Sequence, residues 1–412
     1  MTRPETLGFS SARLARIDRF LKERYIESGK LVGTQLKIAR RGELVHECVA
    51  GLADRERNVP VRDDTIFRIY SMTKPITSVA FMMLVEEGRV ALEDPVHRHI
   101  PAWRDLGVFA AGVPGGFLTK RTDAPMRIID LLRHTSGLTY GFQSRTNVDA
   151  AYRKLGIGPA SLGLGMSEPP LSLDGMIEAL AKVPLEFSPG TAWNYSVSTD
   201  VLGYLIGRIS GIPFEQFLKA RIFEPLGMND TDFVVAENKR PRFAACYALD
   251  AKGGVTLLDD PEKSSYLKPR TFISGGGGLV GTADDYLKFA NTLVKGGSGN
   301  GHRLLAPHTV QLMRMNHLPD GKDLIDMSVS LFSEATYAGL GFGLGFGVTT
   351  NVAKTMVAGS LGEFWWGGAA STTFWVDPVT DVAVVFMTQL MPSNTYPIRR
   401  ELRTLIYAAM EE

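Results

Sequence analysis

Apolar and polar residues at the start of the chain follow first a helical and then a strand-like spacing. Residues 10–25 place four large side chains on one helical face, and a serine at position 10 or 11 can cap this helix. Residues 31–56 contain two alternating runs joined at Arg41-Gly42, which is typical of a β-hairpin. A strongly apolar segment, Ile76 to Val85, ends near Gly88, where a glycine suits a C-cap. The pattern predicts a helix, a hairpin and an apolar helix, in that order.

Helical spacing dominates the middle of the chain, between polar loops rich in glycine and proline. The clearest helical segments are MRIIDLLRHTSG, VLGYLIGRISG and FEQFLKARIFEPLG. Further along, Gly275 to Gly278 form a glycine run, and Thr282 beyond it is a plausible N-cap. We therefore expect a tight glycine loop that leads into another helix.

Strand-like patterns return towards the C-terminus. Glycine occupies every second position from Gly339 to Gly347, which predicts a strand with one bare face. The segments STTFWVDP and DVAVVFMTQ resemble strands on either side of a turn at Pro378. Residues 402–409 then place their apolar side chains on one face of a last helix.

Strands thus lie at both ends of the sequence and helices in its middle. This order favours one antiparallel β-sheet that is assembled from both chain ends and flanked by helices. We predict an α/β fold of the α+β type, with a sheet domain formed by residues 1–93 and 259–412. A mostly helical domain, residues 94–258, is expected to be inserted between these parts. The length of 412 residues agrees with two domains, because it exceeds the size of an ordinary single core.

The composition excludes several classes of partner. Lys and Arg number 45 and Asp and Glu 44, so no charge excess favours nucleic acid or a membrane surface. No apolar run has the length of a membrane span, and the N-terminus lacks the apolar region of a secretory signal. This predicts a cytoplasmic protein, or one from which a leader has been removed. Cys48 and Cys246 are too few for a disulfide scaffold and are expected to be buried.

Common catalytic and metal-binding motifs are missing from the sequence. There is no G-x-S-x-G elbow, which weakens an ordinary α/β-hydrolase interpretation. His46-Glu47 begins like a zinc-protease motif, but Ala50 stands where the second histidine is required. His97 and His99 have no obvious third ligand. We therefore predict neither a metal site nor a cofactor.

Ser71 and Lys74, in the segment IFRIYSMTKPITS, remain as candidates for chemistry. Pro75 has no backbone N–H and is tolerated only near the first turn of a helix, so the helix must begin close to Ser71. Residues three apart are neighbours on a helix, and the Lys74 amine can therefore reach the Ser71 hydroxyl. The Ser71 N–H also lies among the helix-start amides that lack intrahelical partners and favour negative charge. One segment can supply a nucleophile, a proton acceptor and half of an oxyanion hole.

The same pair has a simpler interpretation, in which Ser71 caps the helix and Lys74 points into solvent. The S-x-x-K spacing alone is a weak signal, because chance places it in many chains of this length. A lysine activates a serine only where burial or a nearby cation lowers the lysine pKa. Apolar neighbours such as Ile69, Ile76 and Phe81 offer burial, and a third polar group would complete a catalytic site.

Six motifs along the chain resemble those of the serine β-lactamase and penicillin-binding-protein superfamily. They are, in order, FRIYSMTKPITS, LLRHTSGLTY, FSPGTAWNYS, FEPLGMNDT, SGGGGLVGTADDYLKF and WWGGAASTTFWVDP. Within this superfamily the chain is similar to class C-like members and to the family VIII carboxylesterases. The resemblance runs over most of the chain and implies a sheet domain made from both chain ends and a helical domain that carries Tyr195.

The resemblance also implies roles for particular residues. Ser71 matches the family's nucleophile, Lys74 the lysine of its S-x-x-K box, and Tyr195 the tyrosine of its Y-x-N element. Trp366-Gly367-Gly368 stand where penicillin-recognising members have a K-T-G strand. Ala369 follows them, and its N–H is expected to complete an oxyanion hole with that of Ser71. A cationic Lys74 would stabilise the phenolate of Tyr195, so the two residues are expected to share one proton as a coupled base.

Two departures from the lactamase pattern bear on the substrate. Trp366 and Gly367 replace the lysine and hydroxyl that hold a β-lactam carboxylate, and Val197 replaces the usual amide of the Y-x-N element. A site with fewer cationic and amide groups should bind a neutral acyl group better. The W-G-G triplet also resembles the third motif of family VIII esterases. We therefore predict hydrolysis of short-chain carboxylic esters, with weak β-lactam hydrolysis as a side activity and with a substrate contacted by Trp366, Gly367, Gly368 and Val197.

Three other functions remain open. A β-lactamase or D-Ala-D-Ala peptidase would hydrolyse nitrocefin or a cephalosporin faster than p-nitrophenyl butyrate. An acyltransferase would deliver the acyl group to an alcohol instead of water. A catalytically silent member would serve as a ligand-binding module, although the intact Ser71, Lys74 and Tyr195 argue against it.

Overall fold

The computed structural model describes residues 3–158, 171–250, 252–329 and 338–411. Within these residues one eight-stranded antiparallel sheet contains β1 (Gly33–Arg40), β2 (Glu43–Asp54), β3 (Val59–Pro60), β12 (Leu340–Phe342), β13 (Gly347–Thr349), β14 (Phe364–Gly367), β15 (Thr373–Asp377) and β16 (Val382–Met387). Their order across the sheet is β12-β13-β14-β15-β16-β1-β2-β3. The N-terminal β1 pairs with the C-terminal β16, with Leu36 opposite Phe386. Both chain ends therefore build one sheet, which confirms the predicted fold class.

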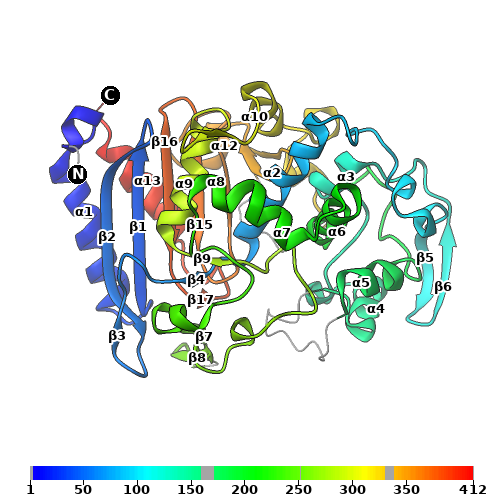
Figure 1. Cartoon of the computed structure of the whole chain (residues 1–412), viewed down its shortest axis with the longest axis horizontal. Helices are drawn as coiled ribbons and strands as arrows, with labels where there is room; N and C mark the ends of the chain where they lie inside the picture. The colour runs from blue at the N-terminus through cyan, green and yellow to red at the C-terminus, as the bar shows by residue number, and fades with distance from the viewer. Residues whose placement is uncertain (1–2, 159–170, 251, 330–337, 412) are drawn as a thin grey trace.

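Helices cover both faces of this sheet (Figure 1). The helices are α1 (Ser11–Leu21), α2 (Thr73–Glu86), α3 (Ile128–Leu132), α4 (Asn147–Leu155), α5 (Leu173–Leu180), α6 (Ser198–Ser210), α7 (Phe214–Leu218), α8 (Glu224–Leu226), α9 (Ala283–Val294), α10 (Pro307–Met313), α11 (Leu324–Met327), α12 (Val352–Thr355) and α13 (Ile398–Ala409). The terminal helices α1 and α13 pack against each other on one side of the sheet, and α9 packs against β1, β15 and β16 on the other. The Thr282 side chain caps α9 by accepting a hydrogen bond from the Asp285 N–H, as predicted. None of the described helices is long and apolar enough to span a bilayer.

Short strands outside the main sheet were not expected from the sequence. They are β4 (Phe67–Arg68), β5 (Val108–Val113), β6 (Gly116–Lys120), β7 (Cys246–Leu249), β8 (Val255–Asp259), β9 (Val280–Gly281), β10 (Ser298–Gly299), β11 (His302–Arg303) and β17 (Leu390–Met391). The β5–β6 hairpin stands at the far end of the molecule from α1 (Figure 1) and is largely exposed, so its sequence lacks a clear apolar alternation. Strand β8 crosses residue 258, where the two predicted domains were expected to meet. The division into those domains stays a prediction.

The alternating glycines of residues 339–347 do not form the single strand predicted for them. They form two antiparallel strands, β12 and β13, with Phe342 opposite Gly347. The turn between them contains Gly345 at φ 98°, a conformation that favours glycine. A Cβ at Gly345 would also lie 2.3 Å from Cβ of Ser78 on α2. Gly345 thus serves both the turn and the close approach of α2. The alternation of glycines in the sequence does not by itself distinguish this arrangement from a strand with one bare face.

Helix α2 is buried along nearly its whole length. Every residue from Thr73 to Leu84 is buried, and the helix packs against α6. A helix that is apolar on all sides belongs in a protein interior. Its N-terminal end, where Ser71 and Lys74 lie, is therefore held rigidly between the sheet and the helices inserted after α2.

Candidate active site

Ser71 lies in a short turn that leads directly into α2. The turn is a 3-10 helix over Tyr70–Met72, and α2 begins at Thr73, so the helix starts where Pro75 predicted. Tyr70 has φ 42°, in the left-handed region that residues other than glycine rarely adopt. Backbone strain of this kind gathers at functional sites, where surrounding packing maintains it. Ser71 itself is 8% exposed, which leaves its hydroxyl at the edge of the protein interior.

The Lys74 side chain is buried beside Ser71. Its Nζ donates to Ser71 Oγ at 3.3 Å and to the Gly276 carbonyl at 2.6 Å. The residue is only 2% exposed, which contradicts the alternative of a lysine that points into solvent. Nζ also lies 4.4 Å from the centroid of the Tyr195 ring and 5.3 Å from that of Tyr140. Two aromatic rings therefore favour a positive charge on this amine.

Tyr195 connects Lys74 to the sheet. Its hydroxyl accepts a hydrogen bond from Trp366 Nε1 of β14 at 3.3 Å, and the two ring centroids are 5.5 Å apart. Its backbone carbonyl accepts a hydrogen bond from Gln143 Nε2 at 2.5 Å. The structure thus brings Ser71, Lys74 and Tyr195 together with Trp366, from three separate parts of the sequence.

The W-G-G triplet lies at the end of β14, beside the turn that carries Ser71. A Cβ at Gly367 would lie 2.5 Å from Arg399 Nη2, and one at Gly368 would lie 2.5 Å from the Ile69 carbonyl oxygen. Ala369 then lies in a small apolar cluster that also contains Tyr70 and Cys246. Neither the Ala369 N–H nor the Ser71 N–H donates to a backbone carbonyl within the described residues, which leaves both as candidate donors to a developing oxyanion.

Val197 begins the first turn of α6, two residues after Tyr195. Its side chain is 0% exposed, and its N–H donates to the Thr139 carbonyl at 3.2 Å. These contacts fix the backbone that carries Tyr195. The predicted contact of Val197 with substrate stays a prediction.

Asp200 is a buried carboxylate of this site that the sequence did not reveal. Its Oδ1 accepts hydrogen bonds from the Ser274 hydroxyl at 2.6 Å and from the Gly276 N–H at 3.0 Å. Burial raises the pKa of Asp200, and the nearby positive charge of Lys74 opposes this rise. Because Gly276 donates to Asp200 and accepts from Lys74, one peptide residue bridges the two opposite charges. An acidic residue in the first turn of a helix is ordinarily explained by the helix dipole. The position of Asp200 in the sequence therefore did not indicate that it belongs to the active site.

We expect the Asp200→Asn substitution to move the acidic limb of the pH profile of kcat/KM downwards by roughly one pH unit. The negative charge of Asp200 stabilises the protonated form of the coupled Lys74–Tyr195 base. Without that charge the base loses its proton at a lower pH, so activity persists further into the acidic range. The measurement is the rate of p-nitrophenyl butyrate hydrolysis as a function of pH.

Asp285→Asn on α9 is the matched control, because burial also raises the pKa of this carboxyl group. Its carboxylate accepts from the Asp230 N–H, the Thr231 hydroxyl and the Lys288 amine, and no predicted site residue is among these partners. The control should leave the profile in place. An acidic limb that stays fixed in Asp200→Asn would show that Asp200 does not act on the base.

A buried serine–histidine pair lies behind Tyr195. His134 Nδ1 is 3.1 Å from Ser196 Oγ, and the His134 ring is 5.1 Å from the Tyr195 ring. Burial, together with the charge of Lys74, lowers the pKa of His134 well below its usual range, so the ring is neutral near pH 7. Ser196 is 0% exposed. The pair therefore supports the Tyr195 segment and does not offer a second accessible nucleophile.

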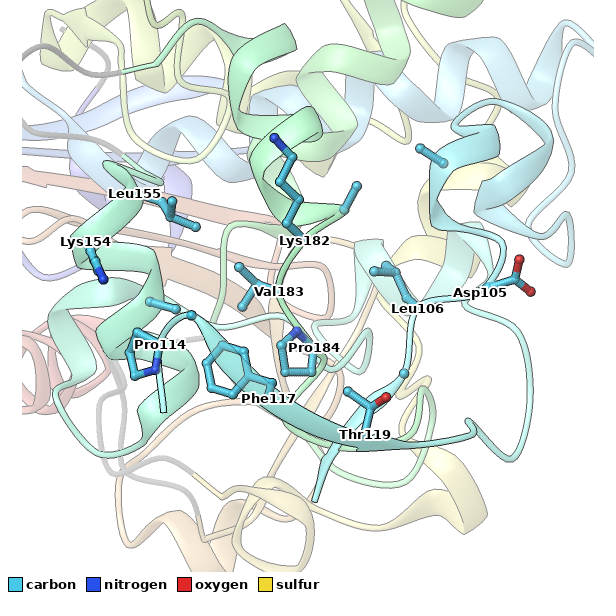
Figure 2. A pocket seen from close by; sticks show the side chains of 15 residues that line it. Asp105, Leu106, Pro114, Phe117, Thr119, Lys154, Leu155, Lys182, Val183 and Pro184 are labelled. Atoms are coloured by element: carbon cyan, nitrogen blue, oxygen red, sulfur yellow. The ribbon is translucent and has the colours of Figure 1, made fainter. Parts of the chain in front are cut away.

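A hollow of about 590 Å³ lies away from these residues, between the β5–β6 hairpin, α4 and the segment after α5. Figure 2 shows Phe117 and Pro184 near its centre, with Lys154 on α4 and Lys182 in the segment after α5 beside it. None of the predicted site residues lines this hollow. The site is therefore identified by its buried polar contacts and not by cavity size.

The same fold and the same motifs recur in known proteins. A family model described as Beta-lactamase matches residues 17–409 of the chain. The chain belongs to this beta-lactamase family. Its predicted kinship with the β-lactamase and penicillin-binding-protein superfamily is confirmed.

Three relatives of this beta-lactamase-family chain are informative. Protein Rv1367c of Mycobacterium tuberculosis is 36% identical over 374 residues, which cover 89% of this chain and 88% of the relative. Esterase EstB of Burkholderia gladioli is 32% identical over 414 residues, which cover 97% of this chain and 95% of the esterase. The structure described as EstCE1, a hydrolase with promiscuous acyltransferase activity, has a TM-score of 0.80 at 27% identity, covering 96% of this chain and 99% of that protein. The chain is therefore a hydrolase or acyltransferase of the β-lactamase fold.

Proposed function

We propose that the chain is a serine carboxylesterase that hydrolyses short-chain carboxylic esters through an acyl-enzyme on Ser71. The observation that carries this proposal is the contact of Lys74 Nζ with Ser71 Oγ, 3.3 Å apart, with the Tyr195 ring 4.4 Å from the same nitrogen. A nucleophile, a basic amine and a phenol within one buried cluster are the groups that acyl transfer requires. Membership of family VIII and a cytoplasmic location stay predictions.

In the acylation step, Ser71 Oγ forms a bond to the ester carbonyl carbon and gives its proton to the coupled Lys74–Tyr195 base. The carbonyl oxygen becomes an oxyanion, which accepts hydrogen bonds from the N–H groups of Ser71 and Ala369. Each donor of this kind typically contributes a few kcal/mol to the transition state. The bond to the alcohol oxygen then breaks, and the same base returns the proton to the departing alcohol.

In the deacylation step, water takes the place of the alcohol. The Lys74–Tyr195 base removes a proton from water, and the hydroxide oxygen bonds to the acyl carbon. The Ser71 Oγ–carbonyl bond breaks, and Oγ recovers the proton from the base. The carboxylic acid leaves, and the enzyme returns to its first state.

The contacts around the site favour a neutral acyl group over a β-lactam with its carboxylate. Trp366 stands where a lactamase lysine would contact that carboxylate, and its indole donates to Tyr195. The Phe342 ring packs against Trp366, with the two ring centroids 5.3 Å apart. The charge of Lys74 is already met by the Gly276 carbonyl and the nearby Asp200. Trp366 and Phe342 are both buried, and apolar, uncharged surroundings of this kind disfavour an anion more than a neutral ester.

Paired assays with p-nitrophenyl esters of increasing chain length and with nitrocefin test this proposal. We expect the best short-chain ester to exceed nitrocefin in kcat/KM by at least roughly tenfold, the discrimination typical of one mismatched polar contact. Faster turnover of nitrocefin would contradict the proposed substrate class and favour the β-lactamase or peptidase alternative.

Acyl transfer is the second candidate, because the EstCE1 structure is described as that of a hydrolase with promiscuous acyltransferase activity. Both reactions share the acyl-enzyme on Ser71 and differ only in the acceptor. The ratio of new ester to free acid, measured with an added primary alcohol, separates them. Free acid as the main product supports the esterase proposal, and new ester as the main product would overturn it in favour of transfer.

A further inference from the structure

Arg399, in the first turn of α13, lies behind the strand that carries the W-G-G triplet. Its Nη2 donates to the Gly368 carbonyl at 2.9 Å and to the Thr372 carbonyl at 2.8 Å. The Gly368 N–H also donates to the Thr372 carbonyl, at 3.0 Å. One guanidinium nitrogen therefore joins both ends of the turn that follows β14.

The Gly368 carbonyl and the Ala369 N–H belong to the same planar peptide unit. A hydrogen bond to the carbonyl oxygen therefore orients the N–H on the other side of the unit. A charged donor also polarises the peptide, which strengthens the N–H as a donor in a buried setting. Arg399 thus acts on the group that the proposed mechanism uses for the oxyanion, without contact with the substrate.

The space next to Gly367 is occupied by the Arg399 guanidinium group. A Cβ at this position would lie between 2.5 and 2.8 Å from three atoms of the Arg399 guanidinium group. Such distances are far below ordinary contact, so a side chain at position 367 would displace the arginine. Gly367, the first glycine of the W-G-G triplet, thus leaves room for Arg399, and the substrate contact expected for it stays a prediction.

We propose that Arg399 is a positioning residue, which orients and polarises the Gly368–Ala369 peptide as the second oxyanion donor. The proposal rests on the proposed acyl-enzyme mechanism, since it assigns the Ala369 N–H to the oxyanion. Because the peptide acts on the transition state more than on the bound ester, loss of Arg399 lowers kcat and leaves KM nearly unchanged.

A cavity beside Arg399 makes a direct test possible. It has a volume of about 350 Å³, lies between the back of the sheet and the start of α13, and is lined by Arg399, Arg400 and Trp365 among others. In Arg399→Ala the missing guanidinium leaves a space that opens into this cavity. A free guanidinium ion can enter there and restore the donor to the Gly368 carbonyl.

We expect Arg399→Ala to lower kcat for p-nitrophenyl butyrate by roughly 10- to 100-fold, with KM changed by less than about threefold. Millimolar guanidinium chloride, far below unfolding concentrations, should restore at least part of the lost kcat. Arg400→Ala is the matched control, because its guanidinium lies beside the same cavity but donates to the Met356 carbonyl and not to the Gly368 carbonyl. The control should keep its kcat and gain nothing from guanidinium. An unchanged kcat in Arg399→Ala, or a loss that guanidinium does not restore, would overturn the proposal.

A stability measurement separates failure of this proposal from failure of the mechanism. Urea unfolding of Gly367→Ala should show a loss of stability in the wild-type background, because the guanidinium must shift away from the Gly368 and Thr372 carbonyls. The loss should be smaller when Arg399→Ala is also present, because the clash with the guanidinium is then absent. Equal losses in both backgrounds would contradict the packing of Arg399 on Gly367 whatever the enzyme's activity. If, instead, the wild-type protein shows no turnover that depends on Ser71, the proposed mechanism itself fails.

Discussion

Replacing Ser71 with alanine is expected to lower kcat/KM for p-nitrophenyl butyrate by roughly 10⁵-fold. The substitution removes the only atom that can form the acyl-enzyme in this mechanism, so no slower version of the same step remains. The Lys74 amine keeps its hydrogen bond to the Gly276 carbonyl at 2.6 Å. The free energy of unfolding should therefore change by no more than about 1 kcal/mol.

Initial rates with purified wild-type and variant protein, together with urea unfolding curves, check this expectation. Ser196→Ala is the matched control, because it removes the hydroxyl of the buried pair with His134. It should retain far more activity than Ser71→Ala. Turnover that survives undiminished in Ser71→Ala would exclude Ser71 as the nucleophile.

Replacing Tyr195 with phenylalanine is expected to lower kcat by roughly 10³-fold, the usual contribution of a positioned acid–base group. Phenylalanine keeps the ring that lies 4.4 Å from Lys74 Nζ and 5.5 Å from the Trp366 ring, and removes only the hydroxyl. The amine then has no phenol with which to share a proton. A loss in kcat with little change in KM would place the effect in proton transfer and not in substrate binding.

A double substitution tests whether Lys74 and Tyr195 are coupled. If Lys74 and Tyr195 act as one base, then the double substitution Lys74→Met with Tyr195→Phe should lose little more than the worse single substitution. Losses that multiply would mean that the two residues act at separate steps. Lys74→Met should also lower stability, because it leaves the buried Asp200 without its nearby positive charge.

Local chemistry explains which parts of the site could be predicted. Pro75 restricts where the helix can begin, and this restriction places the Lys74 amine within reach of the Ser71 hydroxyl. The burial of Lys74, which excludes a solvent-facing amine, came from the structure. The strand and helix patterns at the two ends were strong enough to predict one sheet made from both. The observed pairing of β1 with β16 agrees with that prediction.

Features that depend on packing across distant segments could not be predicted in this way. Asp200 resembles an ordinary acidic residue in a first helical turn, and its contact with Gly276 arises only when residues 76 positions apart meet. The glycines of 339–347 repeat with strand spacing, yet the approach of α2 turns them into a hairpin. Arg399 resembles any exposed arginine of an amphipathic helix until β14 is placed against it. In each case the decisive contact is between segments far apart in the sequence, and local patterns carry no information about such contacts.

Labelling with a p-nitrophenyl alkylphosphonate, followed by intact-mass and peptide mass spectrometry, tests the central claim most directly. Attack by the nucleophile forms an oxygen–phosphorus bond and releases p-nitrophenolate, which leaves a stable adduct in place of the short-lived acyl-enzyme. We predict one adduct per chain, located on Ser71, with complete loss of esterase activity and no adduct in Ser71→Ala. An adduct on another residue, or an enzyme that hydrolyses esters yet forms no adduct at Ser71, would contradict the account.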